Sequence, residues 1–357
     1  MKHLFRNLFI ATFALTAGMF ASCSSDDNNK IIDDKKAVQI NKKNDTALLL
    51  CSFGSSYEQP QQTYKEIIKD FQKKYPKTDI YMAFTSSTIV NKVYADIQKA
   101  YAKPTTWFDP LAEAGYKTIY TQSLHIIPGE EYQKLDGEIN EKLAEKYPDI
   151  KVVKGSCLLE TEEDINNVAT ILYNYYKSHL DKGEVVAFMG HGNDKGENYK
   201  EANEHYTKLE QKLQELSGKK NIFIGTVDWP KMMFGHVRDG IIAYAKEKGL
   251  EEKEYNKLIV NLAPLMSIAG DHAQNDMLGG LEEGQKASDV DPFEEDFDGE
   301  EPCAEFSWIL KLEKLGFTIN EEGSLTDDKN FNVIGLGDHS EIRAIWVDHL
   351  EQALKAK

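Results

Sequence analysis

From Thr46 onward the chain alternates apolar runs with amphipathic segments, and this alternation constrains the fold more than any other feature of the sequence. Each apolar run is continuous, which is typical of parallel strands covered on both faces. The runs expected to be strands are residues 47–53, 79–84, 118–127, 150–153, 184–189, 221–227 and 258–263. The segments with helical periodicity are 64–75, 88–101, 109–114, 130–147 and 237–248. The pattern predicts an α/β fold with doubly wound parallel sheets.

Features of the first half return in the second half at a nearly constant offset of about 140 positions. The matched features are Phe53-Gly54 with Met189-Gly190, Ile80 with Ile222, and Gly129-Glu130-Glu131 with Gly270-Asp271-His272. We interpret the offset as a duplicated α/β unit; the alternative is the general similarity of βα domains. We therefore expect two similar domains, 46–183 and 184–357. Ligands bind beyond the carboxyl ends of parallel strands, so facing domains predict an interdomain cleft.

The first residues have the pattern of an export signal. Lys2 and Arg6 precede an apolar stretch at 8–21 that is too short to span a bilayer, and small residues lead to Cys23. This end resembles the lipobox of bacterial lipoproteins, which implies cleavage of residues 1–22 and a lipid on Cys23. Residues 23–45 are then a polar, flexible tether. We expect an exported, membrane-anchored lipoprotein, in the periplasm or on the outer-membrane surface; a plain signal peptide is the alternative.

Composition excludes some classes of function. The chain has 357 residues with a formal net charge of −17 at pH 7, whereas a nucleic-acid-binding protein needs a basic face to neutralise phosphates. No nucleic-acid partner is therefore expected.

The cysteines are too few for a disulfide framework. Once Cys23 is set aside, Cys51, Cys157 and Cys303 remain, and each is expected to be a small buried side chain.

The candidate site residues follow the expected strands. His125 lies near the end of the run 118–127, His191 and His272 lie in loops after strands, and Asp228 follows the run 221–227. Imidazoles and a carboxylate gathered at one sheet edge suit a divalent transition metal. Four other histidines are expected to be solvated or packing residues, and two are left undecided. The first group is His3, His179, His205 and His349; the second is His236 and His339.

Taken together, the motifs resemble those of the class II tetrapyrrole chelatases, specifically the sirohydrochlorin cobaltochelatases of anaerobic cobalamin synthesis. The resemblance covers about residues 46–348. It rests on Ser52-Phe53-Gly54-Ser55-Ser56, Ser123-Leu124-His125, Met189-Gly190-His191-Gly192, Gly225-Thr226-Val227, Gly335-Leu336-Gly337 and, above all, the stretch from Pro264-Leu265-Met266 to Asp276-Met277.

The resemblance implies that two α/β domains, related by a pseudo-twofold axis, hold a tetrapyrrole between them. It places the metal on His191, position 228 and His272, with Co²⁺, or alternatively Fe²⁺, as a substrate and with no organic cofactor. We expect His191 and His272 to be catalytic, His191 as the acceptor of pyrrole protons. The residues expected to contact the tetrapyrrole are His125, Ser55, Trp229 and Met266; for Trp229, Met232 and Met233 a core position is an equal alternative.

The sequence departs from the family pattern in three places. Asp228 stands where the family has Glu, Asn193-Asp194-Lys195 replaces a histidine-containing stretch, and the insertion at 281–305 is extra. The insertion is either a solvated loop or a flexible acidic lid.

The export signal conflicts with cobalt insertion, which is expected in the cytoplasm. It therefore keeps open a membrane-anchored haem- or tetrapyrrole-binding lipoprotein for haem or iron acquisition, with or without dechelatase activity, and a plain metal-binding lipoprotein. The oligomeric state, including a homo-oligomer, and the metal preference stay open.

Overall fold

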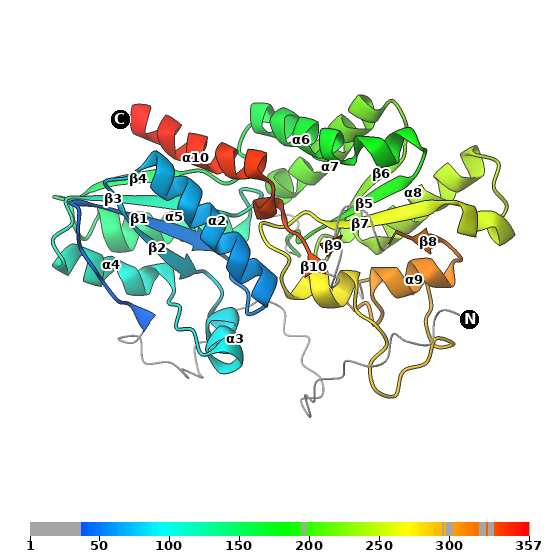
Figure 1. Ribbon diagram of the computed structural model, residues 1–357, viewed down its shortest axis with the longest axis horizontal. Coiled ribbons are helices and arrows are strands. Elements are labelled where there is room, and N and C mark those ends of the chain that lie inside the picture. The colour runs from blue at the N-terminus through cyan, green and yellow to red at the C-terminus, as the bar shows by residue number, and fades with distance from the viewer. Residues whose placement is uncertain are drawn as a thin grey trace.

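A computed structural model describes residues 37–194, 198–294, 296–297, 303–320, 326–327 and 332–356. The expected signal peptide, Cys23, His3 and most of the tether lie outside these residues. Two lobes lie side by side, the N-terminal lobe in blue to cyan and the C-terminal lobe in green to orange (Figure 1). No helix within the described ranges combines the length and the apolar character needed to cross a membrane.

The N-terminal lobe is built on a four-stranded parallel sheet with the order β2-β1-β3-β4. Its strands are β1 (Thr46–Ser52), β2 (Asp79–Phe84), β3 (Thr118–Ser123) and β4 (Lys151–Gly155). The helices between them are α2 (Glu58–Lys74), α3 (Ser87–Ile97), α4 (Pro104–Glu113) and α5 (Glu130–Ile139), which continues as a π-helical turn over Asn140–Ala144.

The C-terminal lobe repeats this sheet with the order β6-β5-β7-β8. Its strands are β5 (Val185–Gly190), β6 (Ile222–Thr226), β7 (Ile259–Pro264) and β8 (Thr318–Ile319). The remaining helices are α6 (Glu162–Asp181), α7 (Lys200–Ser217), α8 (Phe234–Glu247), α9 (Trp308–Lys314) and α10 (Ser340–Lys355). A short antiparallel pair, β9 (Thr326–Asp327) and β10 (Asn332–Val333), precedes α10. The identical strand order in the two sheets confirms the predicted fold class, two similar doubly wound α/β domains.

The two lobes are joined by helices that cross between them. Helix α6, before the expected domain boundary at 183, packs against α7 and β5 of the C-terminal lobe. Helix α10, at the end of the chain, returns to the N-terminal lobe and packs on β4, β3 and α2, where it is the red helix above the sheet (Figure 1). His349 of α10 and Asp164 of α6 form a buried pair with 2.9 Å between Nε2 and Oδ1, which ties these two helices together.

Strand β1 shows why the sequence folds in layers. Leu48 and Leu50 point to the face that packs against α2, and Leu49 and Cys51 point to the opposite face, covered by α4 and α5. All four side chains are fully buried. Successive strand residues alternate between faces, so a strand covered on both sides is apolar at every position. Burying one such leucine contributes roughly 1.5–3 kcal/mol to folding.

Two elements end earlier than the sequence predicts. The helix expected over 88–101 stops at Ile97, because Gln98 adopts a left-handed conformation with φ 56° and its backbone N–H donates to Tyr94 O. The strand expected over 118–127 stops at Ser123. The next residue, Leu124, still donates its N–H to Cys51 O, and the chain then turns toward α5. The shorter strand leaves His125 in a loop.

The acidic insertion at 281–305 is anchored to the C-terminal lobe where it is described. Lys311 of α9 is fully buried, and its Nζ lies 2.7 Å from Glu294 Oε1 and 3.1 Å from Asp296 Oδ1. Asp296 also accepts the N–H of Gly235 in the first turn of α8 at 2.7 Å. Two of the acidic residues therefore hold the segment in place through a buried cation.

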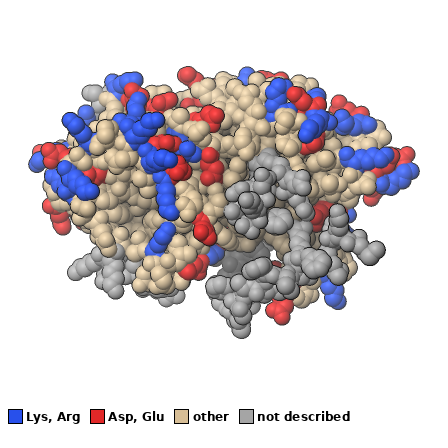
Figure 2. Space-filling view, viewed as in Figure 1, with Lys and Arg blue, Asp and Glu red and all other residues tan. Residues whose placement is uncertain are grey.

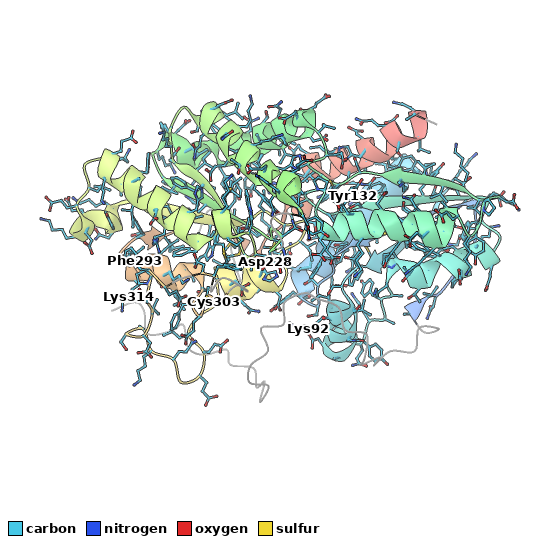
Figure 3. All side chains as sticks on the ribbon, turned by 180° about the vertical axis from the view of Figure 1, so that it is seen from behind. Lys92, Tyr132, Asp228, Phe293, Cys303 and Lys314 are labelled. Atoms are coloured by element: carbon cyan, nitrogen blue, oxygen red, sulfur yellow. The ribbon has the colours of Figure 1, made fainter. Side chains whose placement is uncertain are left out.

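The prediction for the three thiols is confirmed for Cys51 and Cys157 and is wrong for Cys303. The first two are buried in the lobes, whereas Cys303 is exposed because it belongs to the insertion outside both cores. Figure 3 labels it there, beside Phe293 and Lys314.

Candidate active site

Three strand ends of the C-terminal lobe carry the candidate ligands. His191 directly follows β5, Asp228 comes two residues after β6, and His272 ends the loop after β7, at the start of a π-helical turn over Ala273–Met277. Parallel strands end at the same edge of a sheet, so these loops become neighbours. The N–H of Asp228 donates to His191 O at 2.9 Å, which fixes the first two loops to each other.

Gly192 allows this close approach. It has φ 84°, and a Cβ atom there would lie 2.9 Å from the backbone N of Trp229 and 3.0 Å from the Cβ of Thr226. Only glycine adopts such a conformation readily and also leaves space for the neighbouring loop. The glycine after His191 is therefore required by the packing of the site loops.

The structure brings the two predicted imidazoles together. The ring centroids of His191 and His272 are 4.8 Å apart, and the rings are nearly perpendicular at 82°. The side chains are 32% and 27% exposed, but Nε2 of His191 itself is buried, so a ligand reaches that atom only if the side chain or its surroundings shift. Phe53, from the loop after β1, places its ring 6.0 Å from that of His191. The pair therefore lies where the two lobes meet.

The hydrogen bonds of the two rings determine which nitrogen of each ring carries the proton in its neutral form. Nδ1 of His272 lies 2.5 Å from Asp276 Oδ2, and Nδ1 of His191 lies 3.0 Å from Gly192 O. A carboxylate and a carbonyl oxygen can only accept, so each Nδ1 carries the proton. In both neutral rings Nε2 then holds the lone pair. This carboxylate–imidazole arrangement is the one that orients histidine ligands in metal sites.

Asp228 lies on the protonated side of His191. Its Oδ2 is 3.3 Å from His191 Nδ1, the same atom that Gly192 O accepts from. Within the described residues no group of three or more His, Cys, Asp or Glu side chains is arranged to hold a metal ion. A cation bound by both Nε2 atoms and by Asp228 requires this side chain to turn, so the three-residue metal set stays a prediction.

His125 lies at the corresponding edge of the N-terminal sheet. Its Nδ1 is 2.9 Å from Ser123 Oγ and its Nε2 is 3.3 Å from Thr85 Oγ1. Burial lowers the pKa of His125; the charge of Glu131 raises it, and a charge on His191 lowers it further. The net effect favours the neutral ring at pH 7. His125 is thus held by two hydroxyl groups on the side of the junction opposite the imidazole pair.

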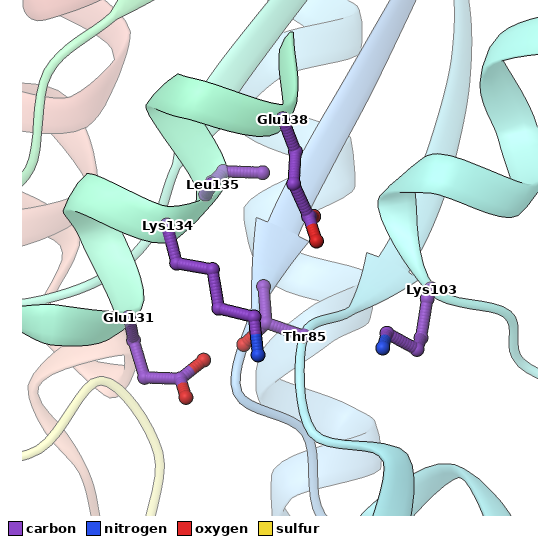
Figure 4. A pocket seen from close by; sticks show the side chains of 6 residues that line it. All are labelled: Thr85, Lys103, Glu131, Lys134, Leu135 and Glu138. Carbon is purple, nitrogen blue, oxygen red and sulfur yellow. The ribbon is translucent and has the colours of Figure 1, made fainter. Parts of the chain in front are cut away.

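A small pocket lies directly beside Thr85. It has a volume of about 10 Å³, enough for one water molecule, and it is shown in Figure 4. Its lining is Thr85, Lys103, Glu131, Lys134, Leu135 and Glu138. The pocket is too small for a tetrapyrrole. Contact of His125 with a tetrapyrrole therefore stays a prediction.

Most of the other residues predicted to contact the tetrapyrrole are more buried than His191 and His272. Ser55 is 2% exposed and its Oγ accepts the N–H of Tyr57 at 3.2 Å. Trp229 is 5% exposed, and Met232 and Met233 are buried with it, which is the core position that the sequence left open. Met266 is half-buried against the same core. Ring contacts from these side chains stay predictions, since Ser55 and Trp229 expose little surface in this conformation.

Two functional features were not assigned from the sequence. Asp276 stands in the motif that carries the resemblance, and no role was expected for it, although it is four residues after His272 and so can face it across one helical turn. Asn193 accepts the N–H of Glu130 across the lobes at 2.9 Å, and Asn203 holds it through two hydrogen bonds. The replaced stretch after His191 thus supplies a contact between the lobes.

The remaining described histidines are engaged elsewhere. His236 Nε2 lies 3.0 Å from Glu210 Oε2, and His339 packs edge-on against the ring of Tyr175 at 4.4 Å. His179 pairs with Glu184 at 2.7 Å, and His205 Nδ1 lies 3.1 Å from Ala202 O. His349 of α10 is buried against Asp164 of α6, and these contacts agree with structural roles for His179, His205 and His349.

Comparison with known proteins gives a consistent result. Residues 46–288 match the family model described as cobalt chelatase (CbiK). The sirohydrochlorin cobaltochelatase of Salmonella typhimurium is 30% identical over 86% of this chain and 96% of its own length. The sirohydrochlorin cobaltochelatase CbiKC of Nitratidesulfovibrio vulgaris is 26% identical over 91% of this chain and 96% of its own length. The solved structure of SirB from Bacillus subtilis with Fe³⁺ is similar in fold, with a TM-score of 0.51 at 12% identity over 86% of this chain and 95% of that one.

Proposed function

The chain belongs to the cobalt chelatase (CbiK) family and is a metal chelatase, and we propose that it inserts Co²⁺ into sirohydrochlorin as a step of cobalamin synthesis. The observation that carries this proposal is the imidazole pair at the junction of the lobes. His191 and His272 have their rings 4.8 Å apart, and each has its proton fixed on Nδ1. In this proposal the two Nε2 atoms, one on the unprotonated side of each ring, bind one divalent cation.

Metal insertion makes two chemical demands on the protein. The hydrated ion must lose water ligands, and two pyrrole N–H protons must leave the macrocycle. A neutral imidazole can meet either demand near pH 7, because its ordinary pKa lies close to 6.5. In this mechanism His191 and His272 bind Co²⁺ through Nε2 and Asp276 keeps the ring of His272 in the required tautomer. As the metal passes to the ring nitrogens, Nε2 of His191 is released and accepts one pyrrole proton, and the second pyrrole proton passes to the released Nε2 of His272 or to water. Asp228 turns toward the metal or continues to orient His191.

The test is spectroscopic and separates the candidate functions. The purified full chain is mixed with sirohydrochlorin and with haem, each with and without Co²⁺. A cobaltochelatase converts the sirohydrochlorin spectrum to that of the cobalt complex faster than the metal does alone. Fe²⁺ in place of Co²⁺ measures metal preference. Sirohydrochlorin that takes up Co²⁺ at the uncatalysed rate in the presence of the chain contradicts the proposal.

We also propose that the chain is exported and carries a lipid on Cys23. The proposal is supported by the basic residues, the apolar stretch and the small residues that precede this cysteine. Radiolabelled palmitate should be incorporated into the wild-type chain and not into the Cys23→Ser chain, and the wild type should sediment with membranes. Equal labelling of both chains contradicts lipidation at Cys23. Light scattering of the detergent-solubilised chain measures whether it forms a homo-oligomer.

The export signal favours a second candidate function, a membrane-anchored protein that binds haem or another tetrapyrrole for haem or iron acquisition. Such a protein uses the same imidazole pair without metal insertion, or removes iron from haem. It predicts a shift of the haem absorption band on mixing, and with a reductant the release of Fe²⁺ to a chromogenic chelator. A haem spectrum that the chain leaves unchanged eliminates this candidate.

A further inference from the structure

A polyanionic substrate poses an electrostatic problem for this protein. The chain has a formal net charge of −17, and acidic and basic side chains are interspersed over the face shown in Figure 2. A tetrapyrrole with carboxylate side chains is repelled by the net field and needs a cation close to the site. Such a cation should lie next to the loops that carry His191 and His272.

Lys92 is a cation that contacts the segment carrying His272. It lies on α3 of the N-terminal lobe, and its Nζ is 2.6 Å from Oδ1 of Asp271, the residue directly before His272. The pair joins residues that are 179 positions apart and belong to different lobes. The side chains of Lys92 and Asp271 are 40% and 42% exposed. Figure 3 shows Lys92 on the N-terminal lobe, at the side facing the lobe that carries Asp228.

We propose that Lys92 binds a carboxylate of the tetrapyrrole, exchanging its ion pair with Asp271 for one with the substrate. This inference rests on the proposed function, because it takes its ligand class from it. Lys92 is then a substrate-binding residue, and the contact with Asp271 keeps the lobes together until the substrate enters.

The contacts around the pair keep the free-energy cost of the exchange small. An exposed ion pair contributes little to stability, so its loss is a small penalty. Asp271 keeps a second partner, because Tyr57 Oη donates to the same Oδ1 at 3.3 Å. The lysine side chain is flexible and its ammonium has three donors, so it can turn to a new acceptor without backbone movement. Neither group is left buried without a hydrogen bond, which is the costly outcome.

The experiment measures metal-free binding of sirohydrochlorin to the full chain by absorbance titration. Lys92→Gln should raise Kd roughly tenfold, as expected for loss of one hydrogen-bonded charge pair. Lys92→Arg should restore most of the affinity, since it keeps the charge and the reach. Lys69→Gln, which removes the same charge from an exposed pair with Glu66 on α2, is the matched control and should leave Kd unchanged. The methyl ester of the tetrapyrrole should bind the wild type and Lys92→Gln equally.

The variant Asp271→Asn should change the affinity for sirohydrochlorin in the opposite direction. It frees Lys92 from its competitor and should lower Kd by about two- to fivefold. In the Lys92→Gln background the Asp271→Asn substitution should lower Kd by less, because the lysine that it would free for the substrate is missing. If instead Lys92→Gln and Asp271→Asn weaken binding alike, the pair is only a structural contact between the lobes and the proposal is overturned. The proposal is also overturned if Lys92→Gln binds sirohydrochlorin as tightly as the wild type does.

The binding experiment distinguishes failure of the lysine contact from failure of the proposed function, because it does not require cobalt insertion. A wild type that binds sirohydrochlorin but does not insert Co²⁺ refutes the proposed function, while a tenfold loss in Lys92→Gln still supports the lysine contact. A wild type that inserts Co²⁺ alongside an unaffected Lys92→Gln variant refutes the lysine contact alone. A wild type that does not bind sirohydrochlorin at all refutes both.

Discussion

The hydrogen bond between Asp276 and His272 gives the sharpest prediction on catalysis. Oδ2 of Asp276 lies 2.5 Å from His272 Nδ1, and the two side chains are 38% and 27% exposed. Removing a carboxylate that orients a metal-binding histidine costs roughly 10–100-fold in affinity or activity, which corresponds to about 1.4–2.7 kcal/mol. Asp276→Asn keeps an oxygen that can accept the Nδ1 proton but loses the charge. We expect about a tenfold loss for Asn and up to about a hundredfold loss for Ala.

The assay follows cobalt entry into sirohydrochlorin by absorbance, with Co²⁺ and the tetrapyrrole varied in turn. The loss should fall on KM for Co²⁺ or on kcat, while KM for sirohydrochlorin stays within twofold of the wild type. Asp181→Asn makes the same change in an exposed pair with Lys177 on α6 and serves as the control. An Asp276→Asn variant that keeps wild-type kinetics at limiting Co²⁺ would refute the assignment. If KM rises equally for Co²⁺ and for sirohydrochlorin, the substitution has disrupted the structure of the segment that carries His272.

Further predictions concern other parts of the fold. Lys311→Ala should lower the free energy of unfolding by about 3–5 kcal/mol in denaturant titrations, because it leaves two partly buried carboxylates without their cation; a loss below about 1 kcal/mol would contradict the anchoring of the insertion. The hydrogen bond with Glu210 raises the pKa of His236, so the stabilisation from this pair is fully present below the ordinary pKa of 6.5 and is lost as pH rises through the raised value. The wild type should therefore exceed His236→Gln in stability by more at mildly acidic pH than at alkaline pH, and a constant difference would disprove the linkage. In a Cys23→Ser chain, a thiol reagent should label Cys303 alone in the folded state, and labelling of a second thiol at the same rate would show that the buried thiols are accessible.

The sequence predicted those parts of the structure that depend on a local pattern of residues, such as the buried strands. Continuous apolar runs predict buried parallel strands, and β2 has the same bounds in the sequence prediction and in the structure. The histidines after such runs were placed at strand ends because parallel strands share an edge. His191 and His272 therefore meet as expected.

Tertiary contacts were not visible in the sequence. No helix was expected over the residues of α10, and an amphipathic pattern alone would not show which lobe its buried face covers. The pairs Lys92–Asp271 and Glu130–Asn193 join distant segments, and each residue alone looks like an ordinary polar surface residue. Asp228 was expected to ligate the metal, whereas the structure places it at the Nδ1 side of His191. Such a choice depends on a rotamer, which the sequence pattern does not determine.

The most direct measurement of the central claim is the rate of cobalt insertion into sirohydrochlorin by the wild type and by a His191→Ala, His272→Ala double variant. The wild type should exceed the uncatalysed rate, and the double variant should fall to that rate while it keeps the circular dichroism of a folded α/β protein. A double variant that turns over as fast as the wild type would show that the imidazole pair is not the site of metal insertion.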